Sequence, residues 1–188
     1  TIAAGNIGGA YWDLDGTDEY ISQEFADGSS LDLAQGTISI WFNSDNNHNG
    51  VLLSVWDADS TSSTAYMNFA TTSNWTSGYA DESLIFYSTI GTTHRQAAWV
   101  RKGHGFYNDQ QWHHVIYSYG GSAATSKFYI DGEYVAHTQG NFDGTPPFFN
   151  ILSGDMVLEI GRRKYSGGSE EFNGKIASVM IWSQPLTQ

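Results

Sequence analysis

Short runs in which apolar and polar residues alternate recur along the whole chain. In the clearest of them, residues 37–43, Ile38, Ile40 and Phe42 are separated by Thr37, Ser39 and Trp41. A period of two is typical of a strand that buries one face. The same pattern predicts strands at 11–14, 20–22, 51–56, 65–70, 84–90, 97–101, 112–119, 127–130, 157–160 and 175–182.

No stretch keeps the 3.6-residue apolar period of a helix, so we expect no helix longer than about three turns. The positions predicted to form the buried face of the strands are Ile38, Ile40, Leu52, Val115, Phe128, Ile130, Leu158, Ile160, Ile176 and Val179.

Residues 111–135 combine two hairpin signals. Asp131-Gly132 separates two short runs of strand-forming residues, and a type I′ turn needs two residues that tolerate positive φ. Gly120-Gly121 begins the loop that precedes the second run. Three consecutive antiparallel strands are therefore expected in the middle of the chain. Together with the other strands they predict an all-β fold, an antiparallel β-sandwich of two packed sheets.

Length and charge narrow the choice of partner. The 188 residues fit a single domain spanning 1–188. With 8 Lys and Arg against 20 Asp and Glu, the formal charge of -12 argues against nucleic acid and anionic membrane and favours a neutral or cation-bridged ligand. No apolar run is long enough for membrane insertion. The sequence begins at Thr1, without a methionine or a leader segment, so we expect the chain to be part of a larger polypeptide.

Several short motifs occur in a familiar order. They are Leu14-Asp15-Gly16, residues 36–42, the Trp112-His113-His114-Val115 run, the hairpin at 128–132, Glu159-Ile160-Gly161, residues 172–176 and residues 181–186. In this order they resemble the laminin-G-like, concanavalin A-like lectin and glucanase jelly roll over roughly the whole chain. The resemblance implies a jelly-roll sandwich. This fold carries lectin-like, adhesion and glycanase functions, so the fold alone does not select among them.

Strand parity predicts which loops meet. Successive loops of an antiparallel sandwich alternate between its two ends. One end should collect residues 57–64, 91–96, 120–126 and 137–155, and the other residues 71–83, 102–110, 131–132 and 162–171. The second end gathers aromatic and basic residues, and aromatic rings beside hydrogen-bonding groups suit sugars. The ligand-binding residues predicted there are Trp75, Tyr79, His104, Tyr107, Arg162 and Tyr165.

The first end is acidic. Calcium takes six to eight oxygen ligands, several of them carboxylates. The resemblance implies a calcium ion between the loop after residues 50–53 and the loop that ends at Asp155, with Asp57 or Asp59 and Asp143 or Asp155 as its ligands. The alternative is that these four residues are ordinary solvated turn aspartates.

Signals for an enzyme are weak. Glycanases of the resembled fold use a Glu-x-Asp-x-x-Glu strand, which this sequence lacks, and there is no Gly-x-Ser-x-Gly elbow. His113 and His114 should point to opposite faces of one strand, and we expect His114 to be the buried, hydrogen-bonded one.

The sequence therefore predicts a non-catalytic glycan- or surface-recognition module that is extracellular, cell-surface or virion-associated. The alternatives are an adhesion or structural domain that binds a protein partner, and a glycanase or lyase of the same fold.

If the acidic end binds calcium, adding the ion should raise the melting temperature, because a ligand of the folded state stabilises it by mass action. The measurement is thermal unfolding with calcium or with EDTA, on the parent chain and on Asp57→Ala with Asp59→Ala. Identical midpoints in all four conditions would make these residues ordinary turn aspartates.

Overall fold

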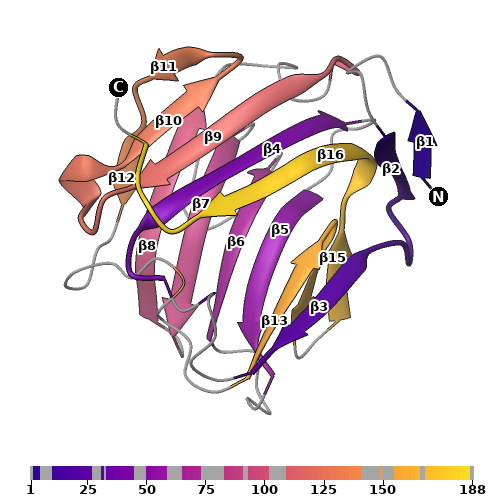
Figure 1. Cartoon of the computed structure of the whole chain (residues 1–188), viewed down its shortest axis with the longest axis horizontal. Helices are drawn as coiled ribbons and strands as arrows, with labels where there is room; N and C mark the ends of the chain where they lie inside the picture. The colour runs from indigo at the N-terminus through magenta and orange to yellow at the C-terminus, as the bar shows by residue number, and fades with distance from the viewer. Residues whose placement is uncertain are drawn as a thin grey trace.

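The chain folds into two large antiparallel sheets packed face to face (Figure 1). A computed structural model describes residues 2–4, 10–26, 31, 33–44, 50–58, 65–72, 83–90, 93–101, 109–140, 149, 155–165 and 168–186. The predicted all-β sandwich is confirmed. In the described residues the helical structure is a three-residue 3-10 turn, Ala123–Thr125, and none of it is long and apolar enough to span a membrane.

The first sheet has seven strands and faces the viewer in Figure 1. Its order is β1 (Ile2–Ala4), β2 (Ala10–Asp15), β16 (Asn173–Trp182), β4 (Gly36–Ser44), β9 (His113–Tyr119), β10 (Lys127–Ile130) and β11 (Glu133–Val135). The N- and C-terminal regions therefore meet in this sheet, where β16 lies between β2 and β4.

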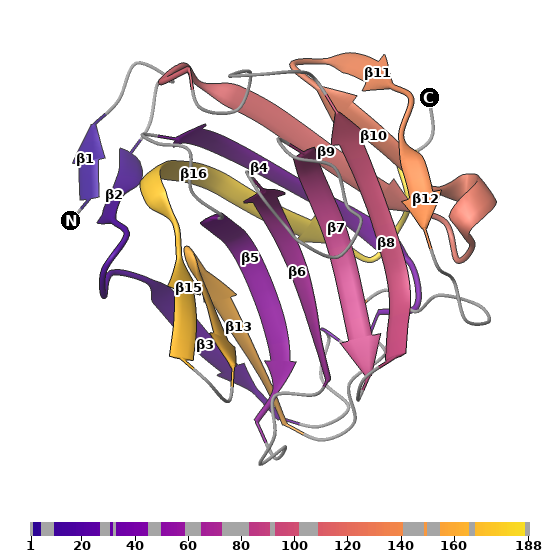
Figure 2. The same cartoon turned by 180° about the vertical axis from the view of Figure 1, so that it is seen from behind.

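The second sheet also has seven strands and faces the viewer in Figure 2. Its order is β12 (Thr138–Gly140), β8 (Thr93–Arg101), β7 (Ser83–Ile90), β6 (Ala65–Thr72), β5 (Gly50–Asp57), β13 (Met156–Ile160) and β3 (Ile21–Phe25). A separate hairpin of β14 (Arg162–Tyr165) and β15 (Gly168–Glu171) contacts β5.

The predicted central hairpins are confirmed. β9, β10 and β11 are consecutive antiparallel neighbours, and Ile130 pairs with Glu133 across the Asp131-Gly132 turn. The φ angles of 52° at Asp131 and 84° at Gly132 are those of a type I′ turn. Three loops were predicted too long, since β8 begins at Thr93, β12 lies within 137–155, and the polar segment 162–171 forms the β14–β15 hairpin.

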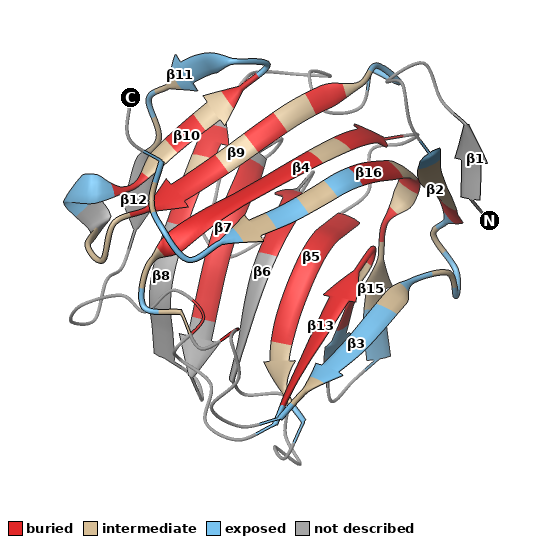
Figure 3. Cartoon of the chain, in the orientation of Figure 1, coloured by how far each residue is buried: buried red, intermediate tan, exposed pale blue. Residues whose placement is uncertain are grey.

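Aromatic rings fill the space between the sheets. Tyr117 of β9 stacks on Phe86 of β7 with ring centroids 4.3 Å apart, and Phe128 of β10 lies 4.8 Å from Tyr117. Figure 3 shows buried residues along the strands of both sheets. Of the ten predicted core residues, only Val179 is not fully buried; it is half-buried and packs against the core. The nine that are buried are Ile38, Ile40, Leu52, Val115, Phe128, Ile130, Leu158, Ile160 and Ile176.

The outer faces of the two sheets differ. On the second sheet, Val51, Ala70 and Ile85 form one row across β5, β6 and β7, and all three are buried although they alternate with core residues. Tyr87 is buried beside this row and Trp99 packs against it. The outer face of the first sheet, in contrast, carries exposed large apolar side chains, including Met180 and Trp182.

Gly174 lies where β16 crosses close to the end of β4. Its φ of +141° is outside the range of most L residues, and a Cβ there would overlap the carbonyl oxygen of Asn43. Gly132 also has a positive φ, +84°, but no atom lies within 4 Å of where its Cβ would be.

Gly174→Ala should therefore lower the free energy of unfolding by about 3 kcal/mol or more, because backbone strain and steric overlap add. The matched substitution Gly132→Ala carries the strain without the overlap and should cost about 1 kcal/mol. Denaturant unfolding of both variants measures the difference, and equal losses would show that β16 does not approach β4 this closely.

Candidate functional site

A buried carboxylate and an arginine form the centre of the candidate site. Glu159 of β13 is 1% exposed and lies on the side of the second sheet that faces away from the core, between Leu158 and Ile160 of the core cluster. Arg162 begins β14 after the turn at Gly161. Its Nε donates to Glu159 Oε2 at 3.2 Å and its Nη2 donates to Oε1. A two-pronged bond of this kind compensates a buried carboxylate.

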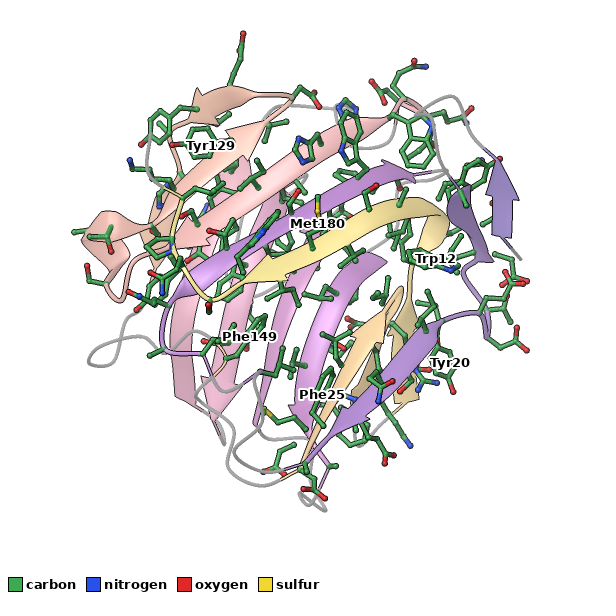
Figure 4. The ribbon with its side chains drawn as sticks, viewed as in Figure 1. Trp12, Tyr20, Phe25, Tyr129, Phe149 and Met180 are labelled. Atoms are coloured by element: carbon green, nitrogen blue, oxygen red, sulfur yellow. The ribbon has the colours of Figure 1, made fainter. Side chains whose placement is uncertain are left out.

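Tyr20, just before β3, lies against the same guanidinium. The Arg162 Cζ atom is 3.2 Å from the centre of the Tyr20 ring, a cation–π contact. Burial disfavours the charged guanidinium, but the bonds to Glu159 and the contact with Tyr20 outweigh it and raise the pKa of Arg162. Tyr20 remains 40% exposed, and Figure 4 shows its ring at the edge of the molecule beside β3.

The β14–β15 hairpin fixes the other side of the site. Ser54 Oγ of β5 donates to the Arg162 carbonyl oxygen at 2.8 Å, and Arg163 Nη2 pairs with Glu170 Oε1 at 2.9 Å within the hairpin. Lys164 Nζ lies 5.9 Å from the centre of the Trp56 ring. The buried Trp56 Nε1 atom has no hydrogen-bond partner within the described part of the chain. We call Tyr20, Trp56, Glu159, Arg162 and Lys164 the arginine cluster.

One predicted ligand-binding residue, Arg162, belongs to this cluster. Tyr165 lies in β14, where only its backbone is described. The predicted residues Trp75, Tyr79, His104 and Tyr107 lie outside the described residues. Sequence reasoning missed Tyr20, Trp56 and Glu159. For Glu159 a signal was available, since a single acid inside the apolar run 156–160 has a basic residue three positions later.

The acidic end brings two of the four predicted calcium ligands together. Asp57 pairs with Met156 across β5 and β13, and the Ala58 N–H donates to the Asp155 carbonyl oxygen at 2.8 Å. Asp59 and Asp143 lie outside the described residues. Within the described ranges, no group of three or more His, Asp, Glu or Cys residues gathers around one point. The described residues thus supply two carboxylates at this end and not a complete ligand set.

The two adjacent histidines have the opposite burial from that predicted. His113 is buried, whereas His114 is half-buried on the outer face of the first sheet. His113 Nδ1 lies 2.9 Å from Asp131 Oδ2 and its Nε2 lies 3.1 Å from Asp109 Oδ1. The ring therefore joins the segment before β9 to the hairpin turn, which is an anchoring role.

His114 is hydrogen-bonded as predicted, with its Nε2 2.7 Å from Ser39 Oγ. It also stacks on Trp41 with ring centroids 4.7 Å apart. Burial lowers the pKa of His114, against the opposing influence of Asp131, so the imidazole is neutral at neutral pH.

The structure is similar to several solved proteins. A carbohydrate-binding module, CBM40, of a Ruminococcus gnavus IT-sialidase superposes with a TM-score of 0.64 at 15% identity, covering 95% of this chain and 94% of that one. A pentraxin from Limulus polyphemus gives 0.57 at 16% identity, covering 94% and 77%. Domains LG4-5 of the mouse laminin alpha1 chain give 0.59 at 14% identity, covering 94% and 43%. At these identities the similarity establishes the fold.

A search of curated protein sequences finds no match. A sequence family does match, over residues 15–188, which is most of the chain. Its description agrees with the order of motifs and with the sandwich of two antiparallel sheets. The chain belongs to the laminin-G-type family of the concanavalin A-like lectin/glucanases superfamily.

Proposed function

We propose that this chain is a non-catalytic glycan-recognition module and that its ligand contacts the arginine cluster. The observation that carries the proposal is an exposed aromatic ring held in place by buried partners. Tyr20 is 40% exposed, and its ring stacks on the Arg162 guanidinium, which the buried Glu159 holds by hydrogen bonds. A sugar has an apolar C–H face and a hydroxyl edge, so a preorganised ring next to hydrogen-bond donors suits it.

Donors are present around the ring. A guanidinium has five N–H groups, and the two bonds from Arg162 to Glu159 occupy only part of them. Lys164 is exposed, and the buried Trp56 Nε1 is a donor without a described partner. Buried donors are normally paired, and because this atom is shielded from solvent, an ordered water would be its partner.

Lys164 gives the cluster one positive charge while the whole chain is acidic, so both neutral and anionic sugar units are candidates. Glu159 and Glu170 already pair with Arg162 and Arg163, and the whole chain carries a formal charge of -12. The similar CBM40 of Ruminococcus gnavus has been solved with alpha2,6 sialyllactose, at a TM-score of 0.62 and 16% identity. This neighbour supports a carbohydrate ligand as a class. Neutral and sialylated sugars therefore both belong in the test.

The state of the acidic side chains supports a non-catalytic role. A retaining glycanase needs two carboxyl groups about 5 to 5.5 Å apart that face its substrate. Glu159 is paired with Arg162 and almost inaccessible, and Asp109 and Asp131 both bind His113. Each of these carboxylates thus serves an internal contact.

We also propose that calcium binds at the acidic end, beside Asp57 and Asp155. The support is their adjacency at the ends of two paired strands, together with the preference of calcium for carboxylate oxygens. An extracellular, cell-surface or virion-associated location fits such a module, and the similarity to laminin domains supports this.

Tyr20→Ala should weaken glycan binding by at least about 1 kcal/mol, as expected when a ring that stacks on a ligand is removed. Tyr20→Phe keeps the ring and should retain most of the affinity. A glycan array with neutral and sialylated sugars, with calcium or EDTA, identifies the ligand, and calorimetry then compares the variants.

The matched control is Tyr134→Ala, which removes an exposed ring from the first sheet, where Tyr134 is 55% exposed. It should leave affinity unchanged. Equal affinities of the parent chain and Tyr20→Ala would move the sugar site away from the arginine cluster, and an array without any bound sugar would refute glycan recognition.

A further inference from the structure

The outer face of the first sheet carries a band of apolar side chains. The strand register places Tyr129, Ile116, Ser39 and Met180 in one row across β10, β9, β4 and β16. Tyr134 of β11 extends the row through a ring contact with Tyr129, at 5.9 Å between centroids. Figure 4 shows Tyr129 and Met180 on the sheet nearest the viewer.

Neighbouring rows of the same face add further apolar groups. Trp41 and His114 stack in the next row, and Trp182 pairs with Thr37 in the row on the other side. The segment after β16 returns to this last row, where the Leu186 N–H donates to Ser118 Oγ at 2.9 Å. We call Trp41, Ile116, Tyr129, Tyr134, Met180, Trp182 and Leu186 the aromatic band.

The aromatic band is the main exposed apolar surface of the described residues. Among the described residues, five large hydrophobic side chains are exposed. Four of them belong to the band: Tyr134 at 55%, Met180 at 44%, Trp182 at 41% and Leu186 at 43%. Aromatic residues and Met are enriched at the centres of protein interfaces, where Lys, Glu and Asp are depleted.

Most polar groups of this face are bonded internally or buried. Ser39 bonds His114, and Asn43 Nδ2 donates to the Gln110 carbonyl oxygen at 2.7 Å, while Asn43 Oδ1 is buried without a described partner. Thr37 and Ser118 hold the segment that contains Gln184 and Leu186. A sugar needs accessible hydrogen-bonding groups for its hydroxyls, so this face suits a protein surface better.

Charge and area indicate which protein fits. The register puts four charged side chains of the described strands on this face, Asp13, Asp15, Lys175 and Lys127, and Lys175 lies 4.0 Å from Asp13. The two signs balance, so the face is nearly neutral in a chain of charge -12. Seven strands about 4.8 Å apart, with an average of six residues at about 3.3 Å each, give a face of roughly 650 Å², which is at the lower end for a specific interface. A standard interface buries about 800 Å² per partner.

We propose that the aromatic band is a self-association surface, through which two copies of this chain pack sheet against sheet. A two-fold interface uses the same patch on both copies, so a nearly neutral apolar face can complement itself without charged partners. Sheets packed face to face lie about 10 Å apart. The acidic groups elsewhere on the two copies repel each other, and salt screens this repulsion as the Debye length shortens from about 30 Å at about 0.01 M to about 8 Å at physiological ionic strength.

The test is sedimentation velocity over a concentration series at low and high salt. A monomer–dimer equilibrium is expected that strengthens as salt rises, because salt screens the repulsion between two acidic copies and leaves the apolar contact intact. Met180→Glu should raise the dimer dissociation constant at least about tenfold, since it places like charges in the interface.

Trp182→Glu is the second interface variant, and Gln23→Glu on β3 of the opposite sheet is the matched charge control, which should dimerise like the parent chain. Unchanged melting temperatures of the monomers would confirm that each variant folds. A parent chain that stays monomeric at its highest soluble concentration would overturn the proposal. A dimer whose dissociation constant is unchanged by Met180→Glu and Trp182→Glu, or rises with salt, would also overturn it. The same holds if these variants lose glycan binding and no dimer is observed.

Discussion

The buried carboxylate of Glu159 constrains the arrangement of everything around the candidate site. A carboxylate that is 1% exposed must be paired, because an uncompensated buried charge costs several kcal/mol. Arg162 supplies the partner, and it reaches Glu159 because the chain turns at Gly161, where φ is +83°. That turn directs β14 over β5, and the guanidinium then holds the ring of Tyr20. One electrostatic requirement thus positions three separate segments.

The two sheets have different surroundings, and this difference separates the two proposed surfaces. The second sheet buries apolar residues on both of its faces, as the row of Val51, Ala70 and Ile85 shows. Polar recognition on that side is therefore left to the edge where β3, β13 and β14 meet. The first sheet leaves its outer face uncovered by any described strand, and the aromatic band lies there. A glycan at one surface and a second copy at the other would not compete.

The alternation of residues was enough to predict the longer strands and most of the core, because strand formation and one-sided burial are local properties of the sequence. The type I′ turn at Asp131-Gly132 was predictable for the same reason. The alternation missed the short strands β1, β12, β14 and β15. The partners that side chains find across the tertiary structure could not be predicted in this way. Nothing local to Arg162 indicates Tyr20, which is distant in the sequence and reaches it through the pairing of β3 with β13.

The two histidines show how a correct local pattern can still give a wrong assignment. Val115, Tyr117 and Tyr119 are all buried, and His113 shares their parity along the strand. The alternation correctly indicated that the two rings lie on opposite faces of β9. The prediction that His114 is the buried ring was wrong, because His113 is buried. Burial of His113 is made favourable by Asp109 and Asp131, and Asp131 arrives only through the hairpin.

The most direct test of this account is a double-mutant cycle between Glu159→Gln and Arg162→Gln, measured by denaturant unfolding. We expect Arg162→Gln to cost about 3 to 5 kcal/mol, because it leaves the buried Glu159 carboxylate without its partner. Glu159→Gln should cost less, because the Arg162 side chain keeps some contact with solvent. The double variant should be more stable than the sum of the two losses implies, by about 2 kcal/mol or more. Strictly additive losses would show that Glu159 and Arg162 act independently and would contradict the account.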